Sequence, residues 1–226
     1  MRRAAGRRKR WRPVGYRSPM TDRDLVKTLL ERHGATYAED AGIRLADKPA
    51  PLWQLLVLSL LLSARISSHI AVRTARELFD AGCTTPGRTR DTTRQQRVRA
   101  LGRGGYRRYD ERTSTQLGEL AVTVLTEYDG DLRTLHERTD DLEQDLQQFK
   151  GIGPAGAAIF CREVQGTWTD LAPYVDGLAA KGADRLGLPT SPDGLAGLVP
   201  TTDLPRLVAA CVRAARDKLV VDDVRG

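Results

Sequence analysis

The stretch that decides the fold runs from residue 142 to residue 164 and reads LEQDLQQFKGIGPAGAAIFCREV. Its first part spaces apolar side chains as one helix face requires, at Leu142, Leu146 and Phe149. The tight turn Gly151-Ile152-Gly153 follows. A second helix is predicted to begin at Pro154, because proline lacks the N–H that the first helical residue would leave unpaired. The stretch therefore predicts two helices joined by a hairpin.

The hairpin has the features of a phosphate-binding turn. Its two glycines allow another backbone to approach closely, and Ile152 is expected to plug the turn into the core. The unpaired N–H groups at the start of the second helix would face outward and form an anion site. A DNA phosphate fits such a site without any base being read, which predicts sequence-independent binding. The alternative is an ordinary αα-hairpin in a helical bundle.

Nearly every other segment also reads with helical period, so the expected fold class is all-α. Thr21 and Asp24 form a capping-box pattern that opens a helix ending near Gly34. Residues 51–64 are apolar all round, which predicts a buried central helix. Further amphipathic helices are expected after Ser67 or Ser68, over residues 112–128 and over residues 203–218.

The net charge of +7 comes mostly from the first twenty residues, which hold eight arginines or lysines and no acidic residue. Subtracting them from the 36 basic residues of the chain leaves 28, against 29 acidic ones. Such a block predicts a disordered tail over residues 1–20 that binds any polyanion. Alternatively, translation starts at Met20, directly before the first helix cap, and the preceding residues are not translated.

A second basic segment, residues 86–112, holds nine arginines with Tyr106 and Tyr109 among them. Its glycines are expected to break the helix at Gly102, Gly104 and Gly105. Guanidinium groups match phosphate oxygens bidentately, so this segment is a candidate to follow a DNA backbone. The alternative is a solvated, arginine-rich surface loop.

The cysteines and histidines exclude several classes of site. Three widely spaced cysteines form neither a disulfide framework nor a zinc pattern, and they suit a reducing cytoplasm. The three histidines are equally scattered, so no metal site is expected. The longest apolar run, residues 52–64, is too short to cross a bilayer. We expect a soluble cytoplasmic protein without membrane contact, associated with the nucleoid if the chain is bacterial.

Three segments resemble the helix-hairpin-helix DNA glycosylase superfamily, in its endonuclease III branch. Residues 149–157, Phe-Lys-Gly-Ile-Gly-Pro-Ala-Gly-Ala, resemble the family's hairpin Leu-Pro-Gly-Val-Gly-x-x-Thr-Ala. Residues 60–65, Leu-Leu-Leu-Ser-Ala-Arg, are similar to its Leu-Leu-Ser-Ala-Gln turn into the minor groove. Residues 174–177, Tyr-Val-Asp-Gly, match the place of the aspartate that follows the hairpin. Gly-Leu after that aspartate is closer to the monofunctional, adenine-removing members than to the lyases.

The resemblance implies a helical barrel and a second subdomain with duplex DNA across the cleft, into which the target nucleotide is flipped. It implies that Asp176 stabilises the cationic sugar or activates the attacking water. A helix N-cap at Asp176 needs no chemistry, and the two roles can coexist. The expected DNA contacts are Arg65, Arg103, Arg107 and the hairpin residues Lys150, Gly151, Ile152, Gly153, Pro154, Ala155 and Gly156.

The chain departs from the family pattern at three places. Ala155 stands where bifunctional members carry the Schiff-base lysine, and alanine cannot form an imine, so no lyase activity is expected. Lys150 and Lys181 are the nearest substitutes. Cys211 alone near the C-terminus cannot hold a four-cysteine iron–sulfur cluster, so no cofactor is expected, and a monovalent cation at the hairpin is left open. Arg65 stands where the family has the glutamine that fills the hole left by the flipped base. Either Arg65 inserts into the DNA at this place, or the inserting role has been lost.

The expected organisation places the helical barrel at residues 51–165, and a terminal-helix subdomain at residues 21–50 together with 166–226. The leading hypothesis is a monomeric, monofunctional DNA glycosylase of base-excision repair that grips duplex DNA through phosphates, with the lesion left open. Two alternatives remain. One is a non-catalytic helix-hairpin-helix DNA-binding protein, and the other is a helical interaction protein that keeps only the scaffold.

Overall fold

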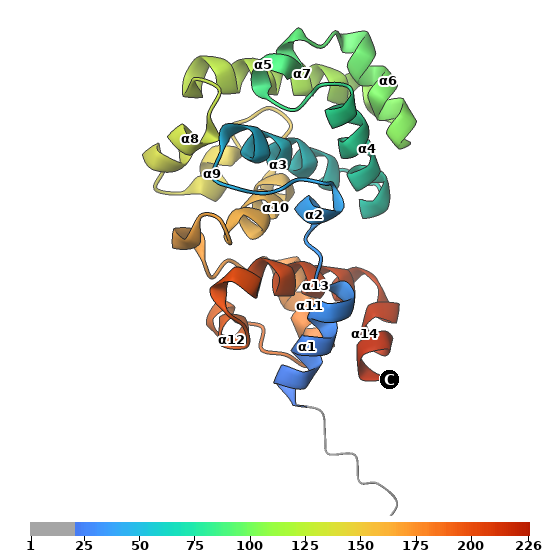
Figure 1. Cartoon of the computed structure of the whole chain (residues 1–226), viewed down its shortest axis with the longest axis vertical. Coiled ribbons are helices and arrows are strands. Elements are labelled where there is room, and N and C mark those ends of the chain that lie inside the picture. Colours follow the sequence, from blue (N-terminus) through green and yellow to red (C-terminus); the bar gives the residue numbers. More distant parts are fainter. Residues whose placement is uncertain (1–20) are drawn as a thin grey trace, which may run out of the picture.

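The computed structural model describes residues 21–226, and every regular element in this range is helical (Figure 1). The all-α prediction is therefore confirmed. The predicted basic tail, residues 1–20, lies outside the described residues. None of the helices in the described range is long and apolar enough to cross a membrane.

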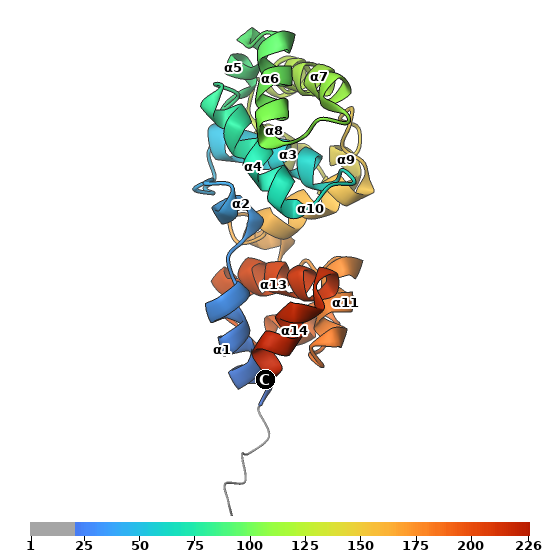
Figure 2. The same ribbon diagram turned by 90° about the vertical axis from the view of Figure 1, so that its right-hand side faces the viewer.

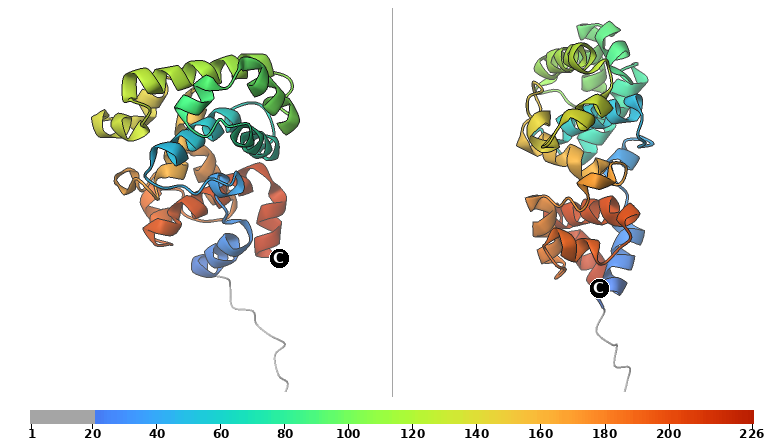
Figure 3. Two further views of the ribbon diagram at one scale, coloured as in Figure 1. Left: turned by 45° about the horizontal axis from the view of Figure 1, so that its top comes forward. Right: turned by 90° about the vertical axis from the view of Figure 1, so that its left-hand side faces the viewer.

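The helices form two groups along the long axis of the molecule (Figures 1 and 2). The larger group comprises α3 (Pro49–Leu62), α4 (Ser68–Asp80), α5 (Pro86–Asp91), α6 (Arg94–Gly104), α7 (Asp110–Tyr128), α8 (Leu132–Arg138), α9 (Leu142–Leu146) and α10 (Pro154–Val164). The smaller group, with α1 in blue and the rest in orange to red in Figure 3, comprises α1 (Asp22–His33), α11 (Gly177–Arg185), α12 (Pro192–Ala196), α13 (Leu204–Arg216) and α14 (Lys218–Arg225).

Three short elements of the described chain lie in connections, and two of them lie between the two groups. Helix α2 (Tyr37–Asp40) lies between the groups, and the 3-10 helix η1 (Thr169–Leu171) lies in the connection from α10 to α11. The 3-10 helix η2 (Thr201–Asp203) lies within the smaller group, between α12 and α13. Helix α10 packs against α13 across the boundary, and one connected apolar core runs through both groups. The predicted division into two subdomains stays a proposal.

Helix α3 forms the centre of the larger group, as its all-round apolar sequence predicts. Its residues from Leu55 to Leu62 are all buried, and it packs against α4, α8 and α10. Trp53 is also buried and donates its indole N–H to Thr89 Oγ1 at 3.2 Å, so the one polar group of this large side chain is paired. Leu60, near the other end of α3, lies beside the hairpin at Gly151.

The smaller group is built on a close crossing of α11 and α13. Gly182 of α11 lies so near α13 that a Cβ there would stand 1.7 Å from the carbonyl oxygen of Cys211. The helix predicted over residues 203–218 is observed as α13, which ends two residues earlier, at Arg216. Asp217 has extended backbone and accepts a hydrogen bond from Leu219 N at 2.9 Å, which ends α13 and caps a separate α14.

The loop alternative for the arginine-rich segment is wrong for residues 86–104, which form α5 and α6. Thr93 and Gln96 make a capping box that begins α6. Arg97 is buried and donates to Ser114 O at 2.9 Å and to Thr89 O at 3.0 Å, so it ties α5, α6 and α7 together. This arginine is structural and does not face a DNA backbone.

Candidate active site and nucleic-acid interface

The hairpin has the geometry that its glycines predict. Gly151 adopts a φ of +98°, a conformation that residues with a Cβ rarely take, and Ile152 is buried. A Cβ on Gly151 would lie 3.0 Å from side-chain atoms of Leu60 and Gln116, which shows how tightly the turn packs on α3 and α7. Gly153, by contrast, faces open space. The outer side of the hairpin is therefore free for another backbone to approach.

The N-terminus of α10 emerges from this hairpin without a side-chain cap. Pro154 has no N–H, and the N–H groups of Ala155 and Gly156 have no acceptor within the helix. Ala155 is exposed, whereas Gly156 packs near Ser63 in the turn that follows α3. Two of the segments singled out by the sequence, the hairpin and the turn at residues 60–65, thus lie side by side.

A cavity of about 480 Å³ lies next to these two segments. One wall is a single face of α10, formed by Ala155, Ala158, Ile159 and Arg162. The turn after α3 contributes Arg65, and the start of α11 contributes Asp176. The structure therefore brings Arg65, Ala155 and Asp176, which are far apart in the sequence, to one cavity.

Asp176 is the N-cap of α11, as its position before Gly177 predicts. Its Oδ1 accepts a hydrogen bond from Ala179 N at 2.8 Å, and its Oδ2 pairs with the guanidinium of Arg162. The carboxylate side chain is 12% exposed, so it is reached through the cavity. Both oxygens are thus engaged in the structure.

Arg162 is the charged residue in contact with Asp176, and the sequence did not predict it as part of the site. Its side chain is 3% exposed, and its Nε is buried without a hydrogen-bond partner. A helix that begins at Pro154 places residue 162 on the same face as Ala155, so helical spacing alone could have indicated its direction. The pairing with Asp176 depends on the path of the chain between the two helices and has no local signal.

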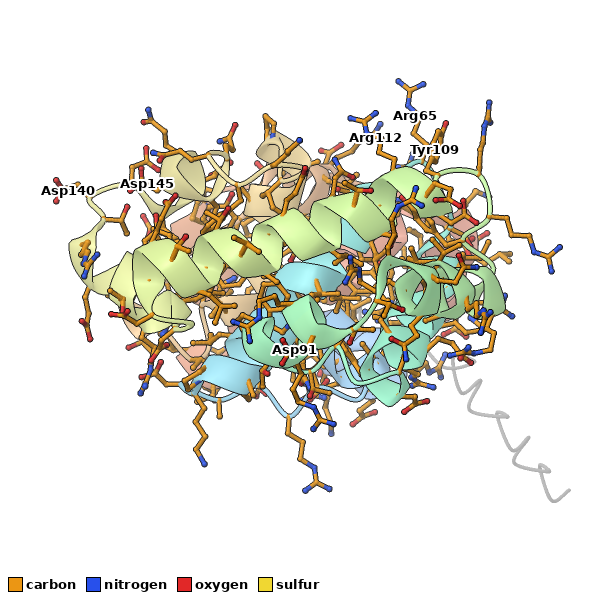
Figure 4. All side chains as sticks on the ribbon, turned by 90° about the horizontal axis from the view of Figure 1, so that it is seen from above. Arg65, Asp91, Tyr109, Arg112, Asp140 and Asp145 are labelled. Carbon is orange, nitrogen blue, oxygen red and sulfur yellow. The ribbon has the colours of Figure 1, made fainter. Side chains whose placement is uncertain are left out.

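A shallower groove beside the hairpin contains two further basic side chains, Arg112 and Lys150. It is lined by Arg112 and Glu119 of α7 together with Lys150 and Gly151. Lys150 Nζ lies 3.1 Å from Glu119 Oε1, so the lysine is held by a carboxylate. In Figure 4, Arg65, Tyr109 and Arg112 project from the same edge of the molecule.

Arg103 and Arg107 lie away from both the cavity and this groove. Arg103 Nε donates to Glu77 Oε2 at 2.6 Å, and Arg107 is exposed in the connection after α6. Both side chains are accessible, but neither lines the cavity or the groove beside the hairpin. Their assignment to DNA contacts stays a prediction.

The cysteines do not fit an iron–sulfur cluster. The whole chain contains three, and each is free and buried: Cys83 in the connection after α4, Cys161 in α10 and Cys211 in α13. A cluster of the expected kind takes four thiolates. Burial also raises the pKa of Cys161 and of Cys211 to about 12, which keeps both thiols protonated.

No protein-family model and no curated protein matches the chain. Among solved structures, a non-covalent endonuclease III–DNA complex is similar, with 15% identity and a TM-score of 0.53 over 84% of this chain and 82% of that one. A trapped endonuclease III–DNA covalent intermediate, an estranged-adenine complex, has 15% identity and a TM-score of 0.48 over 86% of each chain. The likeness at this identity concerns the fold, and the chain thus has a helical fold similar to that of endonuclease III.

Proposed function

We propose that this protein is a monofunctional DNA glycosylase of the endonuclease III type, which binds duplex DNA and hydrolyses the N-glycosidic bond of a flipped base. The observation that carries the proposal is the cavity shared by Arg65, Ala155 and Asp176. Its volume of about 480 Å³ is in the range of small-molecule sites, and it adjoins the uncapped N-terminus of α10. A phosphate at the hairpin would therefore hold DNA directly beside a cavity for one nucleotide.

The chemistry follows from the residues that line this cavity. A sugar that loses its base develops positive charge, which a nearby carboxylate stabilises electrostatically. Asp176 supplies the carboxylate, or receives a proton from the attacking water. Ala155 leaves no amine at the start of α10, so the reaction would end at the abasic site without strand cleavage. A monovalent cation at the hairpin remains part of the proposal.

A second candidate function, a non-catalytic DNA-binding protein, is favoured by one observation. The N-cap bond and the Arg162 pair engage both oxygens of Asp176. A carboxylate whose charge is compensated in this way stabilises a cationic sugar less well than a free one. The glycosylase proposal thus requires the Arg162–Asp176 pair to loosen when a nucleotide enters the cavity.

Base release from duplex oligonucleotides with single lesions distinguishes the two candidates. The lesions are uracil, thymine opposite guanine, adenine opposite oxidised guanine, an oxidised pyrimidine and an alkylated adenine. The wild type is compared with Asp176→Asn, because asparagine can still cap α11 but carries no charge. Asp184→Asn is the matched control, since Asp184 is exposed on the same helix and outside the cavity.

The glycosylase proposal expects strand breaks that need hot alkali, that persist in Asp184→Asn and that are lost in Asp176→Asn. Breaks without alkali would contradict the monofunctional assignment and direct attention to Lys150 and Lys181. DNA binding without breaks on any lesion would support the non-catalytic protein. Absence of salt-dependent binding to undamaged duplex would reject both candidates, because phosphate contacts weaken steeply with salt.

A further inference from the structure

The cavity has an unusual balance of charge for a site that accepts a nucleobase. Among the described residues that line it, the ionisable groups other than Tyr37 are three arginines, Arg65, Arg162 and Arg216, and one carboxylate, Asp176. The Tyr37 ring is buried, with the Arg213 guanidinium 4.6 Å from its centroid. The lining thus offers positive charge and hydrogen-bond donors, and its only carboxyl group is already paired with an arginine.

Arg162 is the most deeply placed of these cations. Its guanidinium has five N–H donors, and within residues 21–226 its one hydrogen-bond partner is Asp176. The Nε–H is buried and unpaired. A buried charged donor without an acceptor is costly, so a ligand that brings a negative oxygen to this guanidinium would relieve that cost.

A base leaves its sugar in one of two ways. A base such as adenine departs readily only after its ring is protonated, which requires a proton donor in the site. A base with carbonyl groups beside the glycosidic nitrogen can depart as an anion, because its negative charge spreads onto the oxygens. Such a departure needs a cation or hydrogen-bond donors aimed at the developing charge. The described residues of the cavity provide these cations and donors, and among them there is no free acid that could protonate a base.

We propose that Arg162 contacts the flipped base and stabilises its negative charge as it departs, so that the cavity selects bases that leave as carbonyl-stabilised anions. This inference rests on the proposed function. It gives the otherwise unpaired donors of Arg162 a partner, and it makes the loosening of the Arg162–Asp176 pair part of substrate binding. Arg162 then exchanges one carboxylate contact for a contact with the base.

The step balances without a further reactant. The C1′–N bond breaks and its electron pair leaves with the base, while a water oxygen forms the new bond to C1′. The proton that the water loses passes to the Asp176 carboxylate and then to the nitrogen of the base. The products are an abasic sugar and a neutral free base, and Asp176 and Arg162 return to their starting states.

The charge of the cavity ranks the candidate lesions. Uracil, thymine and oxidised pyrimidines have a carbonyl next to the glycosidic nitrogen and fit a site that stabilises anions. Adenine lacks a carbonyl, and a base made cationic by alkylation would be repelled by the surrounding arginines. This ranking runs against the similarity of the Gly-Leu pair after Asp176 to adenine-removing enzymes.

Single-turnover excision of uracil and of 5-fluorouracil from the same duplex tests the role of Arg162. Fluorine withdraws electrons and stabilises the base anion by itself, so a cation in the protein matters less for this substrate. We expect Arg162→Gln to slow uracil release about 100-fold, the effect of removing one donor from an oxyanion site. We expect the same substitution to slow 5-fluorouracil release only about 10-fold. Arg216→Gln, an exposed arginine of the same cavity, should slow both substrates by one common factor.

Equal slowing of both substrates by Arg162→Gln would overturn the inference, because a merely structural role for the Arg162–Asp176 pair does not depend on the leaving base. If Arg162→Gln fails to fold, the same comparison of uracil with 5-fluorouracil is made on Arg162→Lys, and the substrate ranking of the wild type tests the inference independently. Wild-type release of adenine or alkylated adenine in preference to uracil would reject the inference but leave the glycosylase proposal standing. Release of no base would reject both.

Discussion

The position of α11, and with it that of Asp176, depends on one glycine. Gly182 lies at the crossing of α11 with α13, where an added Cβ would stand 1.7 Å from Cys211 O, 2.5 Å from Cys211 C and 3.1 Å from Ala215 N. All three are backbone atoms of a helix whose inner residues are buried, so no flexible side chain can move aside. We therefore expect Gly182→Ala to force the two helices apart.

The size of the effect follows from these distances. Non-bonded carbon and oxygen atoms rest at roughly 3.5 Å, so the helices would have to separate by somewhat under 2 Å. Overpacking a rigid core lowers the free energy of unfolding by about 1–3 kcal/mol, and by more in the worst cases. We expect a backbone clash of this depth to lower it by about 4 kcal/mol. For a chain of this length that corresponds to a fall in Tm of roughly 12 °C. The same displacement would move Asp176, at the start of α11, relative to Arg162.

Unfolding in urea, followed by circular dichroism at the helical band, measures this loss. Gly177→Ala is the matched control, because Gly177 lies on the same helix and a Cβ there meets no atom within 4 Å. The control should change the free energy of unfolding by less than about 1 kcal/mol. A free energy of unfolding for Gly182→Ala within about 1 kcal/mol of the wild type would refute the reasoning, since the crossing would then tolerate a side chain.

Two further predictions concern charge. If Lys150 contacts a DNA phosphate, Lys150→Ala should reduce the magnitude of the slope of the log binding constant against log salt concentration by about one on undamaged duplex. Glu119→Gln, which frees this lysine, should tighten binding. An unchanged slope for Lys150→Ala, measured by fluorescence anisotropy, would exclude the contact. Burial raises the pKa of Glu163 above 4.5 in the folded state, so the stability that its protonated form confers is present below about pH 4.5 and is lost as the pH rises. The free energy of unfolding of Glu163→Gln relative to the wild type should therefore increase as the pH rises above about 4.5, and a constant difference would contradict the buried position of this carboxyl.

The elements that could be predicted are those with local signals. Apolar spacing and caps are properties of a few neighbouring residues, which is why α1, α3 and the two helices around the hairpin were predicted near their observed positions. The N-cap role of Asp176 was predictable for the same reason, because its acceptor oxygen serves an N–H three residues away. These signals are independent of the rest of the chain.

The arginine-rich segment shows how composition can hide a local signal. Nine arginines suggested either a loop or a phosphate-binding strip, whereas Thr93 and Gln96 had the spacing of a capping box. The burial of Arg97 could not be read locally, because its acceptors are carbonyls on α5 and α7 that meet only in the folded chain. Charge counts treat every arginine as exposed, and this segment is where that assumption failed.

If the protein binds DNA at the hairpin as proposed, helix α10 couples this binding to the chemistry of the cavity. Its uncapped N-terminus lies at the hairpin and Arg162 lies eight residues further on, which is about 12 Å along a helix. The residues from Ile159 to Val164 are buried, so the helix cannot slide or tilt without disturbing the core. A phosphate bound at Ala155 and Gly156 would therefore fix how far into the cavity the adjacent nucleotide can reach. Changes to the hairpin should alter both the affinity for DNA and the position of the base relative to Arg162. At saturating protein all the DNA is bound, so a slower excision rate then reports the position of the base and not the affinity.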